Sequence, residues 1–392
     1  MGRKNVYEEY CTGCGLCGSV LGASFEERDG FSSVVIGADK ELHAFCTGHC
    51  PAAGLHTKDC TSPWGDYIEV YRAWATEETV RFRGASGGVT TAVALYLLES
   101  GKVDGVIQVG ADPEDPFATK VYCNTDRAGV LACTASRYMT SSPLSTLMDY
   151  LGKGKTYAFV GRPCDVVVLN NFLATHPEYR PDIYCTLTFF CAGAPSQRAS
   201  VELARRLGVR KEDCVNIRYR GEGWPGKATV TDTDGTSHTM EYIDSWNRVL
   251  GRDVRKMCKF CADGVGEAAD ISSGDLWYLD QNKKPLFEER AGENVTFART
   301  QKGYEILADA KEKGYLTLLS YDALGTDMPY IQPYHATRKA LLGAKVLAMK
   351  TAGKNAPRYP RSFLKRCAKA LPVKVRMRTY LGTMKRILKK KL

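Results

Sequence analysis

Three cysteines near the N-terminus have a spacing that can enclose a metal cluster. Cys11, Cys14 and Cys17 form a C-x-x-C-x-x-C run, and Cys50 stands later in the chain, directly before Pro51. A cubane iron–sulfur cluster needs four thiolates from different directions, and two-residue gaps let one tight loop supply three of them. In the C-x-x-C-x-x-C-x-x-x-C-P pattern the fourth cysteine precedes a proline, so Cys50 is the predicted fourth ligand, at the end of an inserted loop. The pattern predicts a [4Fe-4S] cluster.

These thiols leave two alternatives open. Cysteines also bind Zn²⁺, although zinc ribbons favour two C-x-x-C pairs over an evenly spaced triplet. Cys46 is a rival for the fourth position, and the proline after Cys50 favours Cys50. A zinc-stabilised binding protein without redox function is therefore the alternative to an electron carrier.

A second set of cysteines lies in loops with Gly or Pro beside them. Its members are Cys164, Cys191, Cys258 and Cys261. Cys164 and Cys191 follow the predicted strands 156–160 and 183–190, and ligand sites of open α/β sheets lie just past strand ends. The C-x-x-C pair alone would equally fit a zinc half-site or a redox pair. Taken together, the four predict a second [4Fe-4S] cluster, with unrelated structural or redox thiols as the alternative.

A glycine-rich segment, residues 84–88, precedes a predicted helix that ends at Gly101. Glycines before a helix expose its first N–H groups, while Ser86 and Thr90 add hydroxyls and two preceding arginines add positive charge. The arginines are Arg81 and Arg83. This combination suits a phosphate or pyrophosphate, and a flavin dinucleotide would fit. A G-x-S-x-G nucleophile elbow is a formal alternative, weakened by a polar preceding segment and no evident His partner; a plain glycine turn is another.

The order of loops, helices and apolar strands predicts an α/β fold with a mixed-sheet body. A small ferredoxin-like iron–sulfur head is expected at 1–62, the flavin-binding body at 63–330 and a basic helical tail at 331–392. The predicted elements of the body are strands at 67–74, 103–109, 156–160 and 183–190, a helix at 196–207, and a β-ribbon from 215–219 and 227–240.

Positive charge is concentrated at the end of the chain. The net charge is +10, and 18 of the 54 Lys and Arg residues follow Asp327, whereas none of the 44 acidic residues does. Beyond Pro372 an apolar stripe is surrounded by Lys and Arg, which predicts contact with an anionic membrane surface. The stripe consists of Met377, Tyr380, Leu381, Met384 and Leu388. The alternative is a helix docked on its own protein. Nucleic acid is not an expected partner, because no recognisable binding fold is present.

The compartment follows from the absence of targeting signals in the sequence. No apolar run approaches the ~18 residues of a spanning helix, and the start lacks a secretory apolar region. A cytoplasmic protein is expected, with a peripheral position at the inner face of the membrane as an alternative. Clustered cysteines in a reducing compartment indicate metal binding or catalysis. The cysteines outside such clusters are predicted to be buried, inert thiols: Cys60, Cys123, Cys133, Cys185, Cys214 and Cys367.

With these motifs assembled, residues 7–280 resemble the coenzyme F420 hydrogenase/dehydrogenase β-subunit family, which also contains 7-hydroxymethyl chlorophyll a reductase. Several motifs in the same order carry the resemblance, which makes it more specific than a fold analogy. They are Cys11-Thr-Gly-Cys14-Gly-Leu-Cys17, Gly84-Ala-Ser86-Gly87-Gly88-Val-Thr90, Leu97 to Gly105, Ser136-Arg137-Tyr138, Gly161-Arg-Pro163-Cys164, Phe190-Cys191-Ala-Gly193, Cys258-Lys-Phe-Cys261 and Ala269 to Asp275.

The resemblance implies FAD and two [4Fe-4S] clusters. It puts Ser86, Gly87, Gly88 and Thr90 near the flavin phosphates and Ser136, Arg137 and Tyr138 beside the cofactor. It also supports Cys11, Cys14, Cys17 and Cys50 as ligands of one cluster and Cys164, Cys191, Cys258 and Cys261 as ligands of the other. One departure is Asp165, where Gln or a similar residue is expected, and an acid there is expected to alter the flavin environment.

The function that the resemblance implies is an iron–sulfur flavoprotein oxidoreductase. Electrons would pass between ferredoxin or reduced coenzyme F420 and an unknown organic substrate, with bacterial members associated with surface polysaccharide synthesis. A non-catalytic electron-transfer β subunit of a hydrogenase or dehydrogenase complex is the alternative. No catalytic residue is assigned; Asp275 and Tyr138 are candidate proton donors. The substrate and the oligomeric state stay open, and a homo-oligomer is among the alternatives.

Overall fold

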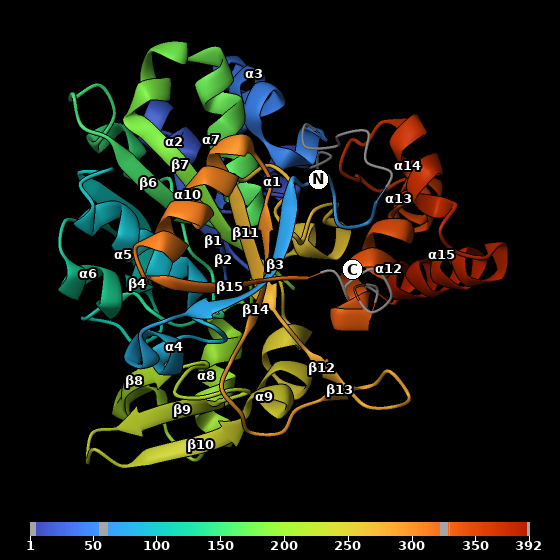
Figure 1. The fold of residues 1–392 in the computed structure, drawn as a ribbon. Coiled ribbons are helices and arrows are strands. Elements are labelled where there is room, and N and C mark those ends of the chain that lie inside the picture. The colour runs from blue at the N-terminus through green and yellow to red at the C-terminus, as the bar shows by residue number, and fades with distance from the viewer. Residues whose placement is uncertain (1–4, 55–61, 322–327, 329, 390–392) are drawn as a thin grey trace.

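A computed structural model describes residues 5–54, 62–321, 328 and 330–389, and its centre is an eight-stranded mixed sheet. The strand order is β15-β3-β14-β11-β7-β6-β4-β5. The strands are β3 (Glu69–Ala75), β4 (Gly105–Ala111), β5 (Thr119–Asn124), β6 (Tyr157–Gly161), β7 (Ile183–Phe189), β11 (Ile271–Asp275), β14 (Asn294–Ala298) and β15 (Leu316–Ser320). The sheet runs through the middle of the molecule (Figure 1).

The centre of the sheet is parallel and both margins are antiparallel. Strands β4, β6, β7 and β11 run in one direction, so their carboxyl ends meet at one edge. Strand β5 pairs antiparallel with β4 on one side, and β14, β3 and β15 continue antiparallel on the other. Residues 183–188 of the central strand β7 are nearly all buried, as expected for a strand with both faces covered.

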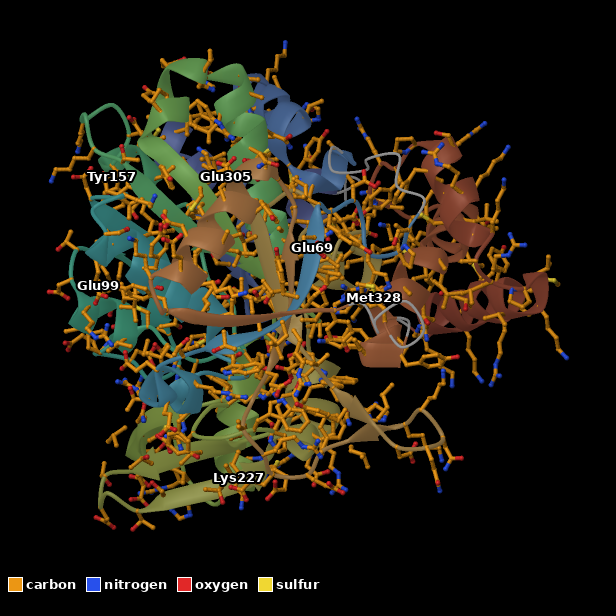
Figure 2. The ribbon with its side chains drawn as sticks, viewed as in Figure 1. Glu69, Glu99, Tyr157, Lys227, Glu305 and Met328 are labelled. Atoms are coloured by element: carbon orange, nitrogen blue, oxygen red, sulfur yellow. The ribbon has the colours of Figure 1, made fainter. Side chains whose placement is uncertain are left out.

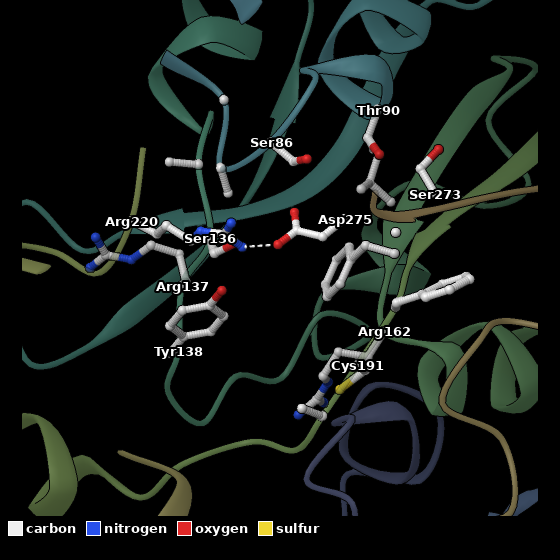
Figure 3. A pocket seen from close by; sticks show the side chains of 18 of the residues that line it. Ser86, Thr90, Ser136, Arg137, Tyr138, Arg162, Cys191, Arg220, Ser273 and Asp275 are labelled. Atoms are coloured by element: carbon white, nitrogen blue, oxygen red, sulfur yellow. Dashed lines mark ion pairs between the residues drawn. The ribbon is translucent and has the colours of Figure 1, made fainter. Parts of the chain in front are cut away.

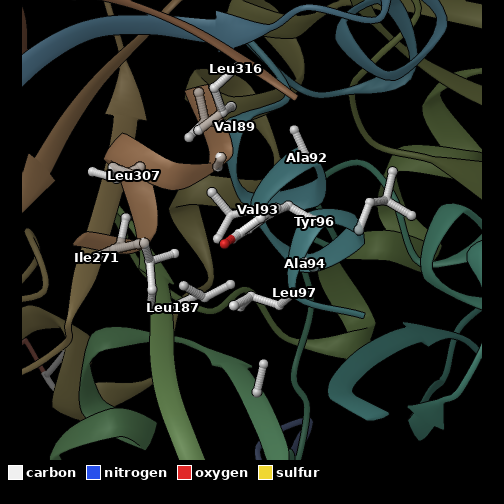
Figure 4. Packing of buried hydrophobic residues seen from close by; sticks show 14 of the residues in the cluster. Val89, Ala92, Val93, Ala94, Tyr96, Leu97, Leu187, Ile271, Leu307 and Leu316 are labelled. Carbon is white, nitrogen blue, oxygen red and sulfur yellow. The ribbon is translucent and has the colours of Figure 1, made fainter. Parts of the chain in front are cut away.

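Two helices cover one face of the sheet. Helix α5 (Val89–Glu99) and helix α10 (Gln301–Glu312) pack on residues that include Leu187 and Ile271. Figure 4 shows Val93 and Leu97 of α5 among these neighbours. Along α5 every side chain from residue 92 to 97 is buried, because the helix packs both on the sheet and against α10. This packing fixes the N-terminus of α5 over the sheet.

The opposite face is covered by α7 (Pro163–Thr175) and by the N-terminal region. Side chains alternate between faces as strand geometry requires: Ala158 joins the α5 core, whereas Tyr157 and Phe159 join the α7 core. The N-terminal region consists of short elements packed beside α7: α1 (Val6–Glu9), α2 (Leu16–Leu21), α3 (Lys40–His49) and a ribbon of β1 (Phe25–Arg28) and β2 (Phe31–Val34).

A smaller three-stranded antiparallel sheet forms a separate layer, at the bottom of Figure 1. Its strands are β8 (Cys214–Arg218), β9 (Lys227–Asp232) and β10 (Ser237–Glu241). It shares a core with α8 (Gln197–Arg206) and borders α9 (Tyr242–Arg248). A short ribbon of β12 (Tyr278–Leu279) and β13 (Pro285–Leu286) completes the strands.

The C-terminal helices pack on the N-terminal region. They are α12 (Pro333–Ala340), α13 (Leu342–Thr351), α14 (Arg361–Ala368) and α15 (Val373–Leu388). Tyr7 and Tyr10 of the head share one core with Val346, Met349 and Phe363 of the tail. Head and tail, predicted as separate units, therefore contribute to a single hydrophobic core.

The mixed α/β fold agrees with the prediction. All four predicted strands of the large sheet, the helix after residue 196 and the β-ribbon are present within a few residues of their expected bounds. The sequence interpretation did not predict the other four strands of the large sheet or the helices α3, α7 and α10. It also missed α4 (Glu78–Arg83), whose polar sequence has little periodicity, and α6 (Arg127–Ala132). Among the described residues, no helix combines the length and apolar character that crossing a bilayer requires. Cys60 lies outside the described residues.

Candidate functional site

A cavity of ≈ 240 Å³, here called the large cavity, opens at the carboxyl ends of the parallel strands. Its lining includes Gly161 at the end of β6, Phe189 at the end of β7 and Asp275 at the end of β11. Ser86 and Thr90, at the N-terminus of α5, and Arg220, from the loop after β8, line it as well (Figure 3). Open α/β sheets bind ligands at this edge, because the loops after parallel strands converge there.

The glycine-rich loop lies at this cavity. Gly88, the residue before α5, has φ +74°, a conformation that glycine adopts without penalty. Ser86 and Thr90 line the cavity, but the Ser86 hydroxyl donates to the Glu293 carbonyl (2.6 Å), so its lone pairs rather than its proton face a ligand. Gly87 is not part of the lining; a Cβ there would lie 2.7 Å from Oδ1 of Asn294.

The positive charge at the cavity comes from other arginines than the sequence suggested. Arg81 donates to the Gly292 carbonyl (2.7 Å), and Arg83 donates to the Leu131 carbonyl (3.3 Å); neither lines the cavity. Three arginines from distant segments line it instead: Arg137, Arg162 and Arg220. No local motif marks them as a group, since they meet only in the folded chain.

Arg220 is the most deeply embedded of these charges. Its guanidinium pairs with Asp275 (2.6 Å), lies 4.0 Å from the centre of the Tyr242 ring and donates to the Pro225 carbonyl. Burial alone would lower the pKa of Arg220, but the Asp275 carboxylate raises it above its ordinary value, so the group stays charged. Its Nη2 has no hydrogen-bond partner among the described residues, which leaves one buried donor for a ligand. The carboxylate of Asp275, a candidate proton donor, is engaged as an acceptor.

The Ser136–Tyr138 segment forms the wall opposite the α5 loop. Arg137 donates to the Ile217 carbonyl (2.8 Å) and lies over the Tyr219 ring. Its Nε is buried without a hydrogen-bond partner in the described structure. Tyr138 packs edge-on against Trp246 (5.2 Å between ring centres). Unpaired buried guanidinium donors and aromatic rings around one cavity fit a ligand that carries phosphates and a flat ring system.

The nucleophile-elbow alternative finds no support in this geometry. The Ser86 hydroxyl donates to a backbone carbonyl, and no histidine is among the described residues that line the cavity. A serine nucleophile needs a base within hydrogen-bond reach.

A second, smaller cavity of ≈ 30 Å³ is lined by all four cysteines of the second predicted set. Cys164 lies in the first turn of α7, Cys191 follows β7, and Cys258 and Cys261 flank a short turn. The Ala194 N–H donates to Sγ of Cys258 (3.4 Å), a contact that protein cluster sites commonly provide. In the described residues no three Cys, His, Asp or Glu side chains are posed as a metal site. The donor set fits a cluster because four thiols from three segments face one enclosed space.

The surroundings of this cavity favour the neutral form of its thiols, and the thiolate form needs a positive charge nearby. Burial raises the pKa of Cys261 to about 12 and that of Cys191 to about 11, while Arg338 opposes the shift at both thiols. Arg338 also donates to the carbonyls of Cys191 (3.0 Å) and Ala192 (3.1 Å). It comes from α12, a tail helix, and sequence reasoning had no signal for it.

The two cavities are neighbours with a common wall. Arg162, Cys191, Gly193 and Ala194 line both of them. Arg162 is held there by Asp165, whose carboxylate accepts from the Arg162 backbone N–H (2.9 Å), Nε (2.7 Å) and Nη2 (2.8 Å). The acid at this unusual position therefore neutralises and fixes a buried arginine between the two cavities.

The head cysteines gather beside the second cavity. The charge of Cys11 acts on both Cys14 and Cys50, which shows that these thiols share one neighbourhood. Burial is the largest influence on Cys50 and raises its pKa well above the ordinary value. Cys46 forms a side-chain hydrogen bond with Cys17, so the rival fourth ligand also lies at the triplet. The structure brings both candidates to the triplet.

Arg255 lies between the two sets of cysteines. Its Nη2 donates to the Ser32 carbonyl (2.9 Å) and to Thr140 Oγ1 (2.8 Å), and Nη1 donates to the Cys11 carbonyl (3.4 Å). The same residue lines the second cavity, together with Thr12 and Pro51 of the head. The head loops thus contribute to the wall of the second cysteine cavity.

Comparison with known proteins gives this arrangement a family. Residues 70–149 match the N-terminal part of the coenzyme F420 hydrogenase/dehydrogenase beta subunit, and residues 154–323 match its C-terminal part. The coenzyme F420 hydrogenase subunit beta of Methanococcus voltae is 25% identical over 71% of this chain and 93% of its own length. The F420-dependent formate dehydrogenase 1 subunit beta of Methanococcus maripaludis is 28% identical over 63% of this chain and 60% of its own length.

A solved structure has the same fold. A chain of the F420-reducing [NiFe] hydrogenase complex from Methanosarcina barkeri superposes with a TM-score of 0.58 at 20% identity, over 76% of this chain and 98% of the other. The matched segments hold the glycine-rich loop, Ser136–Tyr138 and all four cysteines of the second cavity. The chain belongs to the coenzyme F420 hydrogenase/dehydrogenase beta subunit family.

Proposed function

We propose that the protein is an iron–sulfur flavoprotein oxidoreductase. FAD would occupy the large cavity, and two [4Fe-4S] clusters would be bound by Cys164, Cys191, Cys258 and Cys261 and by Cys11, Cys14, Cys17 and Cys50. The observation that carries the proposal is the wall common to the two cavities, formed by Arg162, Cys191, Gly193 and Ala194. A ligand in the large cavity and a cluster in the small one would be separated by little more than these residues.

The chain's own groups have separate roles in this proposal. The N–H groups at the start of α5 and the neighbouring Thr90 hydroxyl would bind the pyrophosphate. Arg137 and Arg220 would donate to ligand oxygens, and Tyr138 with Trp246 would provide an aromatic wall. Gly88 could not be replaced without strain, because a Cβ there would lie 2.8 Å from the Val80 carbonyl oxygen. The flavin, when bound, would supply two-electron chemistry and the clusters single-electron transfer.

The order of the sites suggests a direction. The head triplet, Arg255, the second cysteine cavity and the large cavity follow one another. A one-electron carrier such as ferredoxin would exchange electrons at the head, and reduced coenzyme F420 or an organic substrate would meet the flavin. In the catalytic form of this proposal, the protein is cytoplasmic and reduces an organic substrate, with a link to surface polysaccharide synthesis.

A second form is an electron-transfer subunit that relays electrons to a catalytic partner. It is favoured by the relatives, which are named as beta subunits of F420 hydrogenase and of F420-dependent formate dehydrogenase. The coenzyme F420-dependent sulfite reductase of Methanocaldococcus jannaschii, of which this chain matches 45% of the length at 25% identity, offers a catalytic counterpart.

Metal and flavin analysis after anaerobic purification tests the proposal. Two cubane clusters require about eight irons per chain, together with about one FAD released on denaturation. Because cysteine sites also accept Zn²⁺, zinc is measured in the same sample. About four irons would remove one of the cluster assignments. A chain that contains stoichiometric zinc and no flavin would instead be a zinc-stabilised binding protein.

A further inference from the structure

Helix α15 has two faces in different environments. One face is held by the protein: Thr383 is 1% exposed, Tyr380 and Ile387 are half-buried, and the helix packs against α13. Ile387 reaches the core that head and tail share. The helix is therefore anchored, and its remaining side chains have a fixed orientation toward solvent.

The outward face carries large apolar side chains. Met377 is 60% exposed, Leu381 61% and Leu388 79%. At 3.6 residues per turn these three lie within about 40° of one another around the helix axis, so they form one stripe. The residues of the predicted stripe therefore do not share one environment. Tyr380 and Met384 are half-buried, whereas Met377, Leu381 and Leu388 are exposed to solvent.

A row of positive charge borders this stripe. Lys374, Arg378, Lys385 and Lys389 are exposed and occupy the adjoining sector of the helix. None of the ion pairs found in the described residues involves them, and α15 and α14 contain no acidic residue. Figure 2 shows nitrogen-tipped side chains extending from this end of the molecule. The outward face of α15 is thus apolar along one line and cationic along the next.

We propose that the outward face of α15 docks on an anionic lipid surface. An interfacial helix inserts apolar side chains at the boundary of headgroups and acyl chains while its Lys and Arg contact anionic headgroups. The positive charge without interspersed acids is complementary to such a surface. The matched family segments end at residue 323, so α15 lies outside them. The proposal is independent of the flavin and the clusters.

Vesicle flotation with the full chain tests this. The probes are vesicles of phosphatidylcholine with one quarter phosphatidylglycerol, and vesicles of phosphatidylcholine alone. One variant combines Met377→Ser, Leu381→Ser and Leu388→Ser; a second combines Lys374→Gln, Arg378→Gln, Lys385→Gln and Lys389→Gln. Each basic residue near an anionic surface strengthens binding by about fivefold, so the charge variant should bind at least about tenfold more weakly. A comparable loss is expected for the apolar variant.

Control variants show whether an effect comes from the outward face of α15 or from the overall charge and apolar surface of the protein. Lys120, Lys155, Lys311 and Lys313 are exposed on the body, and their change to Gln removes the same charge; Val215→Ser and Leu319→Ser change exposed apolar residues of the body. These controls should float like the unchanged chain. The proposal is overturned if the tail variants float as well as the unchanged chain. It is also overturned if the lysine control loses as much binding as the tail charge variant, or if the unchanged chain binds the uncharged vesicles. A dimer that the apolar variant converts to a monomer, without vesicle binding, would assign the face to a second copy.

Discussion

Changing Cys191 to alanine is expected to reduce the iron content from about eight to near four per chain, while FAD stays bound. Cys191 is the one thiol of the second set that lines both cavities, so its loss would remove a proposed cluster ligand at the wall that the two cavities share. The Ala side chain leaves the large cavity's other lining intact. Electron transfer between the head and the flavin should fall at least about a hundredfold, since the intermediate carrier is lost. Iron analysis, flavin release and stopped-flow reduction by reduced ferredoxin measure these three effects.

The control lies six residues earlier, within β7. Cys185 is buried in β7 and contributes to the α5 core, away from both cavities. Cys185→Ala should cost about 1 kcal/mol of stability and leave the iron content unchanged. If Cys191→Ala retained all the iron and the full rate, the second cysteine set would not be a cluster site.

Changing Asp165 to asparagine is expected to destabilise the fold by about 3–5 kcal/mol. Asp165 is completely buried, and its carboxylate accepts three hydrogen bonds from Arg162. The amide cannot balance the guanidinium charge, which would remain buried between the two cavities without its counter-ion. Urea unfolding, monitored by far-UV circular dichroism on the purified chain, measures the free energy of unfolding. Arg162 is also expected to shift, so weaker FAD retention should accompany the lower stability.

Asp234→Asn provides the matched comparison. Asp234 lies in the exposed turn between β9 and β10, and surface substitutions of this kind usually change stability by less than about 0.5 kcal/mol. Equal stability of the Asp165 and Asp234 variants would contradict the structural role given to the Arg162–Asp165 pair.

The sequence alone predicted the features of the fold and the candidate site whose determinants are local. The C-x-x-C run, the glycines before α5 and the apolar strands that end at Gly161 and Phe189 each carry their own signal, and strand ends in a parallel sheet must share an edge. Ser86 and Thr90 line the large cavity for this reason, whereas Tyr138, which also lines it, was expected only from the family resemblance. The four second-set cysteines were predicted to meet because a cluster needs four thiolates, and their common cavity is consistent with this prediction.

The sequence was insufficient where contacts join distant segments. Arg220 reaches the cavity from a loop after β8, and Arg338 reaches the second cysteine cavity from a tail helix. Neither stands in a recognisable motif, because a long-range ion pair or carbonyl contact leaves no periodicity in the chain. The same reason hid the core that joins Tyr7 to Met349. Arg81 and Arg83 show the opposite error: proximity in sequence suggested a phosphate contact, but their side chains turn to Gly292 and Leu131.

The most direct test of the central claim is an anaerobic reductive titration of the purified chain with dithionite, followed by absorbance and electron paramagnetic resonance. One FAD takes up two electrons and each [4Fe-4S] cluster takes up one, so the account predicts about four electrons per chain. Bleaching of the flavin should accompany cluster signals that Cys191→Ala diminishes. Uptake of no electrons, or of two by the flavin alone with no cluster signal, would contradict an electron path that links the head to the flavin cavity.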